Sequence, residues 1–167
     1  MDARQILQFL DEQGMAVVFV VVFLEYLNLP GFPAGIILPA TGVWVAYSGQ
    51  NFMLAFGLSI LAGLLGSIVL YAIGYIGEDL LLVKLKAKRP ALGARLDRFE
   101  RRLHDNAFWA VLAGKLIPVL RTLICFPAGA AKVGMKIYLA ASAAGVALWN
   151  GILMAAGYFM GGQVLGL

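Results

Sequence analysis

Two long stretches without any charged residue constrain this chain more than any other feature of its sequence. No Asp, Glu, Lys or Arg lies between Glu25 and Glu78 (residues 26–77, 52 positions), and none follows Lys136 (residues 137–167, 31 positions). A helix needs only about 20 apolar residues to cross a bilayer. Hydrophobic residues make up 62% of the chain, charged residues 13%, and the mean hydropathy is +0.87. Soluble domains carry about 25% charged residues, so the sequence predicts an all-α integral membrane protein.

The first apolar segment, residues 14–48, is broken in its middle by the stretch LPGFPAG. A continuous helix over this segment would be roughly 52 Å long, and each half is roughly 22 Å, at about 1.5 Å per residue. Each half is too short for a hydrocarbon core about 30 Å thick. We therefore expect a re-entrant helical hairpin, whose turn is buried in protein or lines a wet cavity. The predicted turn residues are Pro30, Gly31, Pro33 and Gly35.

A second broken apolar segment covers residues 107–136, and it carries a second copy of the tetrapeptide FPAG at 126–129. Its predicted breaks are at Pro118, Pro127 and Gly129, because Pro and Gly are the residues that interrupt helices most strongly. The two FPAG copies are therefore expected to be the turns of two hairpins. Uninterrupted apolar stretches at 52–76 and 137–161 are long enough to span the membrane.

The sequence thus predicts a single membrane domain over 1–167, built from two similar halves. Repeat 1 covers 1–77 and repeat 2 covers 91–162, each with an amphipathic helix, a broken segment and one full span. With one full span per half, the second half must be inverted relative to the first. Inverted repeats with broken helices are typical of transporters.

A basic loop at 78–106 separates the halves. Eight of the 13 Lys and Arg residues fall in this loop, and the positive-inside rule places such loops in the cytoplasm. We therefore expect a multi-pass protein of the cell inner (cytoplasmic) membrane. The net charge of +4 comes largely from this loop and is therefore explained by membrane topology. No nucleic-acid partner is predicted.

Glu25 lies inside the first broken apolar segment, and Lys115 and Arg121 lie inside the second. A charge at membrane depth costs about 2.5–3.5 kcal/mol on insertion scales and is by default a functional residue. Two cations near broken helices suit a phosphate group. Burial disfavours ionised Glu25 and a nearby Arg121 favours it, so the sequence leaves open whether Glu25 carries a proton or forms an ion pair that phosphate displaces.

Several motifs resemble the DedA family, also called the SNARE-associated or VTT-domain family. These are Glu25 followed by LPGFPAG and Gly42, the stretch GKLIPVLRT, and the closing GYFMGG. The resemblance covers about residues 14–162. It implies translocation of undecaprenyl phosphate or a phospholipid, with two re-entrant hairpins entering from opposite faces. The chain departs from the family pattern in two ways: it lacks a second acid in the first turn, and it has Lys115 where Arg is common.

The same residues also bear on other functions. A membrane-embedded lipid phosphatase needs an acid–base or nucleophilic side chain near the phosphate, and the single His104 lies in the basic loop. A proton- or cation-coupled antiporter using Glu25, and a structural assembly factor, remain alternatives. No cofactor and no metal are predicted. Asn150 is expected to give an interhelical hydrogen bond or polar support to the site, and Gly157-x3-Gly161 to pack helices within the chain or across a homodimer.

Overall fold

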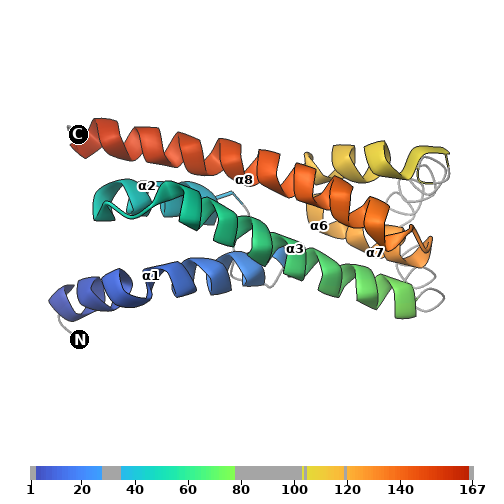
Figure 1. Cartoon of the computed structure of the whole chain (residues 1–167), viewed down its shortest axis with the longest axis horizontal. Coiled ribbons are helices and arrows are strands. Elements are labelled where there is room, and N and C mark those ends of the chain that lie inside the picture. The colour runs from blue at the N-terminus through green and yellow to red at the C-terminus, as the bar shows by residue number, and fades with distance from the viewer. Residues whose placement is uncertain (1–2, 28–34, 78–102, 104, 119, 166–167) are drawn as a thin grey trace. The chain divides into compact units, whose positions relative to one another are not determined.

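The computed structural model describes residues 3–27, 35–77, 103, 105–118 and 120–165 (Figure 1). Within these ranges the chain forms helices and turns, without β-strands. The labelled helices are α1 (Ala3–Tyr26), α2 (Ile37–Ser48), α3 (Phe52–Ile76), α6 (Leu120–Leu123), α7 (Cys125–Ala130) and α8 (Met135–Leu165). Residues 105–115 are also helical. The prediction of an all-α protein is thus confirmed for the described residues.

Two helices are long and apolar enough to cross a membrane: α3, and the part Met135–Gly161 of α8. They coincide with the spans predicted at 52–76 and 137–161. Three shorter apolar helical stretches, of 10–17 residues each, cover Gly14–Tyr26, Ile37–Ser48 and Leu120–Ala130. These stretches fall short of the roughly 20 residues that a span requires. The broken segments are therefore built from short helices, as their Pro and Gly content predicts.

Local sequence explains several helix ends. Asn51 precedes α3, and its side-chain oxygen accepts a hydrogen bond from the backbone N–H of Leu54 at 3.2 Å, as an N-cap residue does. Gly49 ends α2 in a left-handed conformation with φ of 65°, which glycine adopts without a steric cost. The expected amphipathic helix at 1–12 is helical from Ala3, but it continues into α1 without a break.

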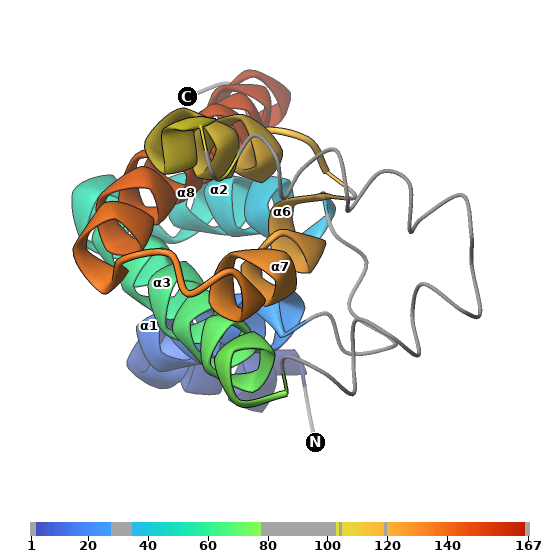
Figure 2. The same ribbon diagram turned by 90° about the vertical axis from the view of Figure 1, so that its right-hand side faces the viewer.

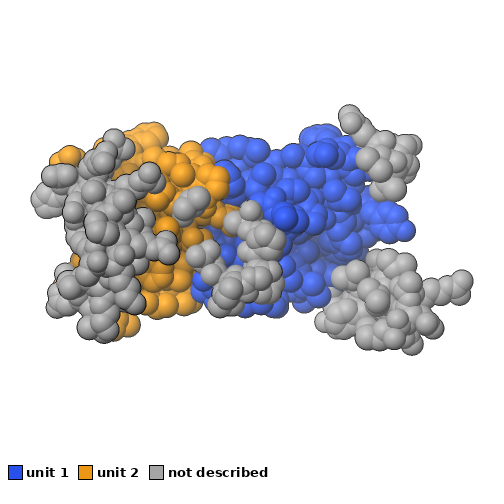
Figure 3. Space-filling view, turned by 180° about the vertical axis from the view of Figure 1, so that it is seen from behind, with its two compact units in different colours: residues 1–65, 147–167 blue, residues 66–146 orange. Residues whose placement is uncertain are grey.

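The contacts within the chain define two compact units (Figure 3). The first unit holds residues 1–65 and 147–167, and the second holds residues 66–146. Helices α3 and α8 each contribute residues to both units. Each unit is described by itself below.

In the first unit, α2 packs against the C-terminal part of α8 at backbone contact distance. A Cβ atom added at Gly42 would lie 2.1 Å from the carbonyl oxygen of Met154. A Cβ atom added at Gly157 would lie 2.0 Å from the carbonyl oxygen of Pro39. Gly161 also faces α2, because a Cβ atom added there would lie 3.1 Å from the Cα atom of Val43. The pair Gly157-x3-Gly161 therefore packs two helices of the same chain, as small residues in membrane helices do.

In the second unit, too, a short helix packs closely against a long helix through glycines. There α7 lies against the C-terminal part of α3 (Figure 2). A Cβ atom added at Gly129 would lie 2.1 Å from the carbonyl oxygen of Tyr71, and one at Gly74 would lie 2.3 Å from that of Phe126. Each unit thus joins a short helix to the second half of a long helix through one glycine on each side.

The second FPAG copy differs from its predicted turn, whereas residues 32–34 of the first copy lie outside the described residues. Pro127 and Gly129 lie within helix α7 and not in a turn. Pro127 is tolerated because it occupies the first turn of α7, where a backbone N–H is least needed.

Other predicted turn residues fall as follows. Gly35 has a φ of +100° directly before α2, and such positive values favour glycine. Pro118 lies in the non-helical stretch 116–118 that follows the helix 105–115. Pro30, Gly31 and Pro33 lie outside the described residues, as do His104 and nearly all of the basic loop.

Candidate functional site

Lys115 is the last residue of the helix 105–115 in the second unit, and its side chain is only 1% exposed. The helix ends there because Leu116 and Ile117 donate to Ala113 and Gly114, the tighter i to i+3 bonds typical of a last turn. The following Pro118 has no N–H with which to continue the helix.

The ammonium group of Lys115 joins three helices. It donates hydrogen bonds to Ser67 Oγ on α3 at 2.6 Å and to Cys125 Sγ on α7 at 3.2 Å. It also lies 5.8 Å from the ring centroid of Tyr138 on α8, within the range of a cation–π contact. Gly145 leaves room for the stem, because a Cβ atom there would lie 2.5 Å from Lys115 Cβ. A buried cation is thus held by neutral acceptors and an aromatic face.

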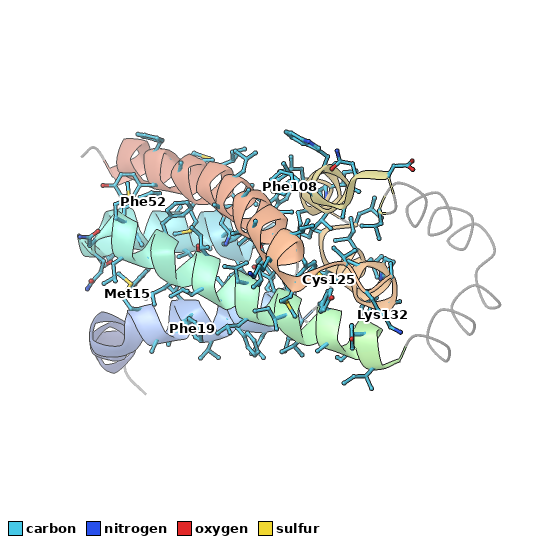
Figure 4. All side chains as sticks on the ribbon, turned by 45° about the vertical axis from the view of Figure 1, so that its right-hand side comes forward. Met15, Phe19, Phe52, Phe108, Cys125 and Lys132 are labelled. Atoms are coloured by element: carbon cyan, nitrogen blue, oxygen red, sulfur yellow. The ribbon has the colours of Figure 1, made fainter. Side chains whose placement is uncertain are left out.

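Arg121 lies in α6, six residues after Lys115, and is also 1% exposed. Its carbonyl oxygen is 3.7 Å from Cys125 Sγ, which can donate to it. Cys125, labelled on α7 in Figure 4, therefore accepts from Lys115 and contacts the backbone of Arg121. Both predicted phosphate-binding cations are buried in the same unit, and the single cysteine connects their two segments.

Tyrosines fix the helices around these cations. The hydroxyl of Tyr138 donates to the backbone oxygen of Ser67 at 2.8 Å, and that of Tyr71 donates to the backbone oxygen of Val133 at 2.6 Å. The two tyrosine rings pack with centroids 4.4 Å apart. The buried hydroxyls thus find acceptors, as buried polar groups do, and they hold α3 against α8 and the turn before it.

Glu25 belongs to the first unit, near the end of α1, and is 1% exposed. The next residue, Tyr26, donates its hydroxyl to Asn150 Oδ1 at 2.8 Å. The amide nitrogen of Asn150 donates to both the carbonyl oxygen and Oγ of Ser59, each at 3.2 Å. Asn150 therefore links α8 to α3 through Ser59 and to α1 through Tyr26, the residue that follows Glu25 in the sequence. An ion pair of Glu25 with the cations stays a prediction.

Sequence reasoning selected the charged residues of the site and missed their partners. Neither Ser67 nor Cys125 is among the predicted site residues. No sequence pattern indicated Tyr138 as a site residue. Ser67 precedes Lys115 by 48 positions, so no local pattern connects them. A polar residue inside an otherwise apolar span is the one signal that could have marked Ser67.

Comparison with known proteins assigns the chain to a family. The model described as VTT domain matches residues 13–159. The chain is 30% identical over 155 residues to a Staphylococcus aureus protein named undecaprenyl phosphate transporter A, covering 87% of this chain and 73% of that protein. It is 26% identical to an alkaline phosphatase-like protein of Lactococcus lactis, covering 93% and 75% of the two chains. It is 25% identical to the uncharacterized membrane protein YbfM of Bacillus subtilis, covering 92% and 94%.

No solved structure matches the chain significantly. The family match nevertheless extends over most of the sequence, including α3, most of α8 and the buried residues Glu25, Lys115 and Arg121. The chain is a membrane protein that belongs to the VTT-domain (DedA) family.

Proposed function

We propose that this protein translocates a phosphate-bearing lipid, undecaprenyl phosphate or a phospholipid, across the cytoplasmic membrane. The observation that carries the proposal is the burial of two cations, Lys115 and Arg121, in one unit of a membrane protein. The name of the Staphylococcus aureus relative, an undecaprenyl phosphate transporter, supports the same substrate class. Lys115 and Arg121 bind the lipid phosphate in this proposal.

The partners of Lys115 suit a reversible phosphate site. Its ammonium group donates to a hydroxyl and a thiol, which are neutral acceptors. An anionic phosphate forms charge-assisted hydrogen bonds, which are roughly twice as strong as neutral ones. A phosphate can therefore displace Ser67 or Cys125 from Lys115. After the lipid leaves, the same two acceptors receive the ammonium group again, so the cation is not left without a hydrogen bond.

The repeated glycine contacts support an inverted-repeat architecture with one re-entrant hairpin in each unit. In both units a short helix packs through glycine on the second half of a long helix. Transporters with inverted repeats bind substrate at broken helices. In this proposal Glu25 carries the coupled proton, because it is an acid buried in an apolar segment of the membrane part.

The direct test is translocation of undecaprenyl phosphate by the purified protein in proteoliposomes. We expect Lys115→Ala and Arg121→Ala to lower the rate at least tenfold, which corresponds to about 1.4 kcal/mol of lost stabilisation. Lys115→Arg and Arg121→Lys retain the charge and separate a loss of binding from misfolding. Lys136→Ala is the matched control, because Lys136 is exposed at the start of α8. Translocation by both alanine variants at the wild-type rate would exclude the phosphate site.

Glu25→Gln tests the coupling separately. If Glu25 carries a proton, the variant loses the dependence of translocation on a pH gradient while lipid binding is retained. A pH profile identical to that of the wild type would exclude Glu25 as the carrier. The measurement also distinguishes the lipid transporter from an antiporter, in which proton flux continues without the lipid.

The name of the Lactococcus relative favours one second candidate, a membrane-embedded lipid phosphatase. Release of inorganic phosphate from undecaprenyl phosphate, measured in the same proteoliposomes, decides between the two. A transporter releases none. Release that depends on Lys115 and Arg121 would assign the buried cations to hydrolysis.

A further inference from the structure

Tyr138 is a buried tyrosine on α8, in the part of the helix that belongs to the second unit. Its side chain is 0% exposed and contacts both Lys115 and Ser67. Phenylalanine or leucine could fill this space without needing a hydrogen-bond acceptor. A tyrosine here instead brings a buried hydroxyl, which must find an acceptor, and an aromatic face, which attracts cations.

The hydroxyl of Tyr138 fixes the residue that binds Lys115. It donates to the backbone oxygen of Ser67 at 2.8 Å, while the side-chain oxygen of Ser67 accepts from Lys115 Nζ at 2.6 Å. A carbonyl oxygen has two lone pairs, so it can accept this bond in addition to a helical one. Ser67 is thus held on its backbone by Tyr138 and on its side chain by Lys115.

The ring of Tyr138 lies beside the same ammonium group. Lys115 Nζ is 5.8 Å from the ring centroid, inside the range of about 6 Å in which a cation is attracted to an aromatic face. Tyr71 packs against this ring with centroids 4.4 Å apart, and its own hydroxyl donates to the backbone oxygen of Val133 at 2.6 Å. The ring of Tyr138 is therefore fixed both by its hydroxyl and by a neighbouring ring that is anchored to the backbone.

From these contacts we infer that Tyr138 is a positioning residue for phosphate binding, which keeps the Lys115 ammonium group in place while a lipid phosphate replaces its present hydrogen-bond acceptors. The inference rests on the proposed function, in which Lys115 binds the phosphate. Ser67 and Cys125 accept hydrogen bonds from Lys115, so a phosphate oxygen competes with them directly. The ring attracts the ammonium group without a hydrogen bond, so this contact persists during the exchange. A lysine stem held in one position loses less conformational freedom when the phosphate binds, which raises the affinity.

The test is binding of undecaprenyl phosphate to the purified full chain in detergent, titrated by native mass spectrometry. Tyr138→Leu removes the ring and the hydroxyl, and we expect it to raise the dissociation constant at least about threefold, the effect of losing a cation–π contact. Tyr138→Phe keeps the ring and should recover most of the lost affinity. Tyr158→Leu is the matched control, because Tyr158 lies on the same helix in the first unit, where it packs against the rings of Phe52 and Phe159. It should bind within about twofold of the wild type, since a contact of Lys115 is not changed.

The same substitution in a Lys115→Ala background separates positioning from packing. There the ring has no ammonium group to hold, so Tyr138→Leu should change the dissociation constant by less than about twofold, as a double-mutant cycle of two coupled residues requires. Arg121, the second cation of the proposed site, is kept in both backgrounds and retains part of the binding. Equal weakening by Tyr138→Leu in the two backgrounds would make Tyr138 a packing residue and overturn the inference.

Three other results would also overturn it: wild-type affinity in Tyr138→Leu, an equal loss in Tyr158→Leu, or a loss in Tyr138→Phe as large as in Tyr138→Leu. Size-exclusion chromatography checks that each variant is folded, and Tyr138→Met replaces Tyr138→Leu if the latter is not. Translocation is measured in parallel. A wild type that binds undecaprenyl phosphate without translocating it refutes the proposed function and leaves the binding result valid, whereas translocation with wild-type binding by Tyr138→Leu refutes the inference alone.

Discussion

Replacing Gly129 by alanine should separate α7 from α3. The new Cβ atom would lie 2.1 Å from the carbonyl oxygen of Tyr71 and 2.8 Å from the backbone nitrogen of Tyr75. Ordinary van der Waals contact begins near 3.4 Å. The obstacle is backbone, which no rotamer change can move, so the two helices must move apart by about 1 Å. Such overpacking of a close contact costs about 1–3 kcal/mol.

Gly57→Ala is the matched control. Gly57 lies in α3, the helix against which Gly129 packs, and an added Cβ atom there meets nothing within 4 Å. An unobstructed Gly-to-Ala change within a helix is neutral or stabilises it by up to about 1 kcal/mol. The two substitutions are chemically identical, so the free energies of unfolding of the two variants should differ by at least about 1 kcal/mol through packing alone.

The assay is reversible unfolding by SDS in mixed micelles, followed by circular dichroism. Translocation is measured on the same preparations, because α7 carries Cys125, whose sulfur lies 3.2 Å from Lys115 Nζ. A 1 Å displacement takes this pair out of hydrogen-bond range, so Gly129→Ala should also transport more slowly than Gly57→Ala. Equal stability of the two variants would refute the packing argument and the repeated glycine contacts built on it.

Three further predictions concern other contacts. Gly42→Ala in the first unit should destabilise the protein by about 1–3 kcal/mol in the same SDS titration, and a neutral result would mean that the contact with α8 is not close. A double-mutant cycle of Tyr26→Phe and Asn150→Ala should give a coupling of about 0.6 kcal/mol, the mean for hydrogen bonds between membrane helices; additive effects would contradict the bond. Ser67→Ala removes the 2.6 Å acceptor of Lys115 and should lower stability by about 1.5–3 kcal/mol, the range for bonds to charged groups, whereas Ser67→Thr retains the hydroxyl and should restore most of it.

The sequence alone determined the class of the protein and the positions of its two long apolar helices. Apolar length and helix-breaking residues are local properties, so the spans at 52–76 and 137–161 and the short helices of the broken segments could be predicted. The burial of three charged residues could be predicted in the same way. An acid or a cation in an apolar run is conspicuous because its burial is costly, and Glu25, Lys115 and Arg121 are all 1% exposed.

Only the tertiary structure decided what these residues contact. Lys115 meets Ser67, 48 positions earlier, because the helix 105–115 packs against α3 and α7. The sequence predicted breaks at Pro127 and Gly129, whereas both residues lie in helix α7. Gly129 packs against α3, where a Cβ atom would lie 2.1 Å from a backbone carbonyl oxygen. Helix position is encoded locally, whereas the face that a helix presents depends on the partner against which it packs.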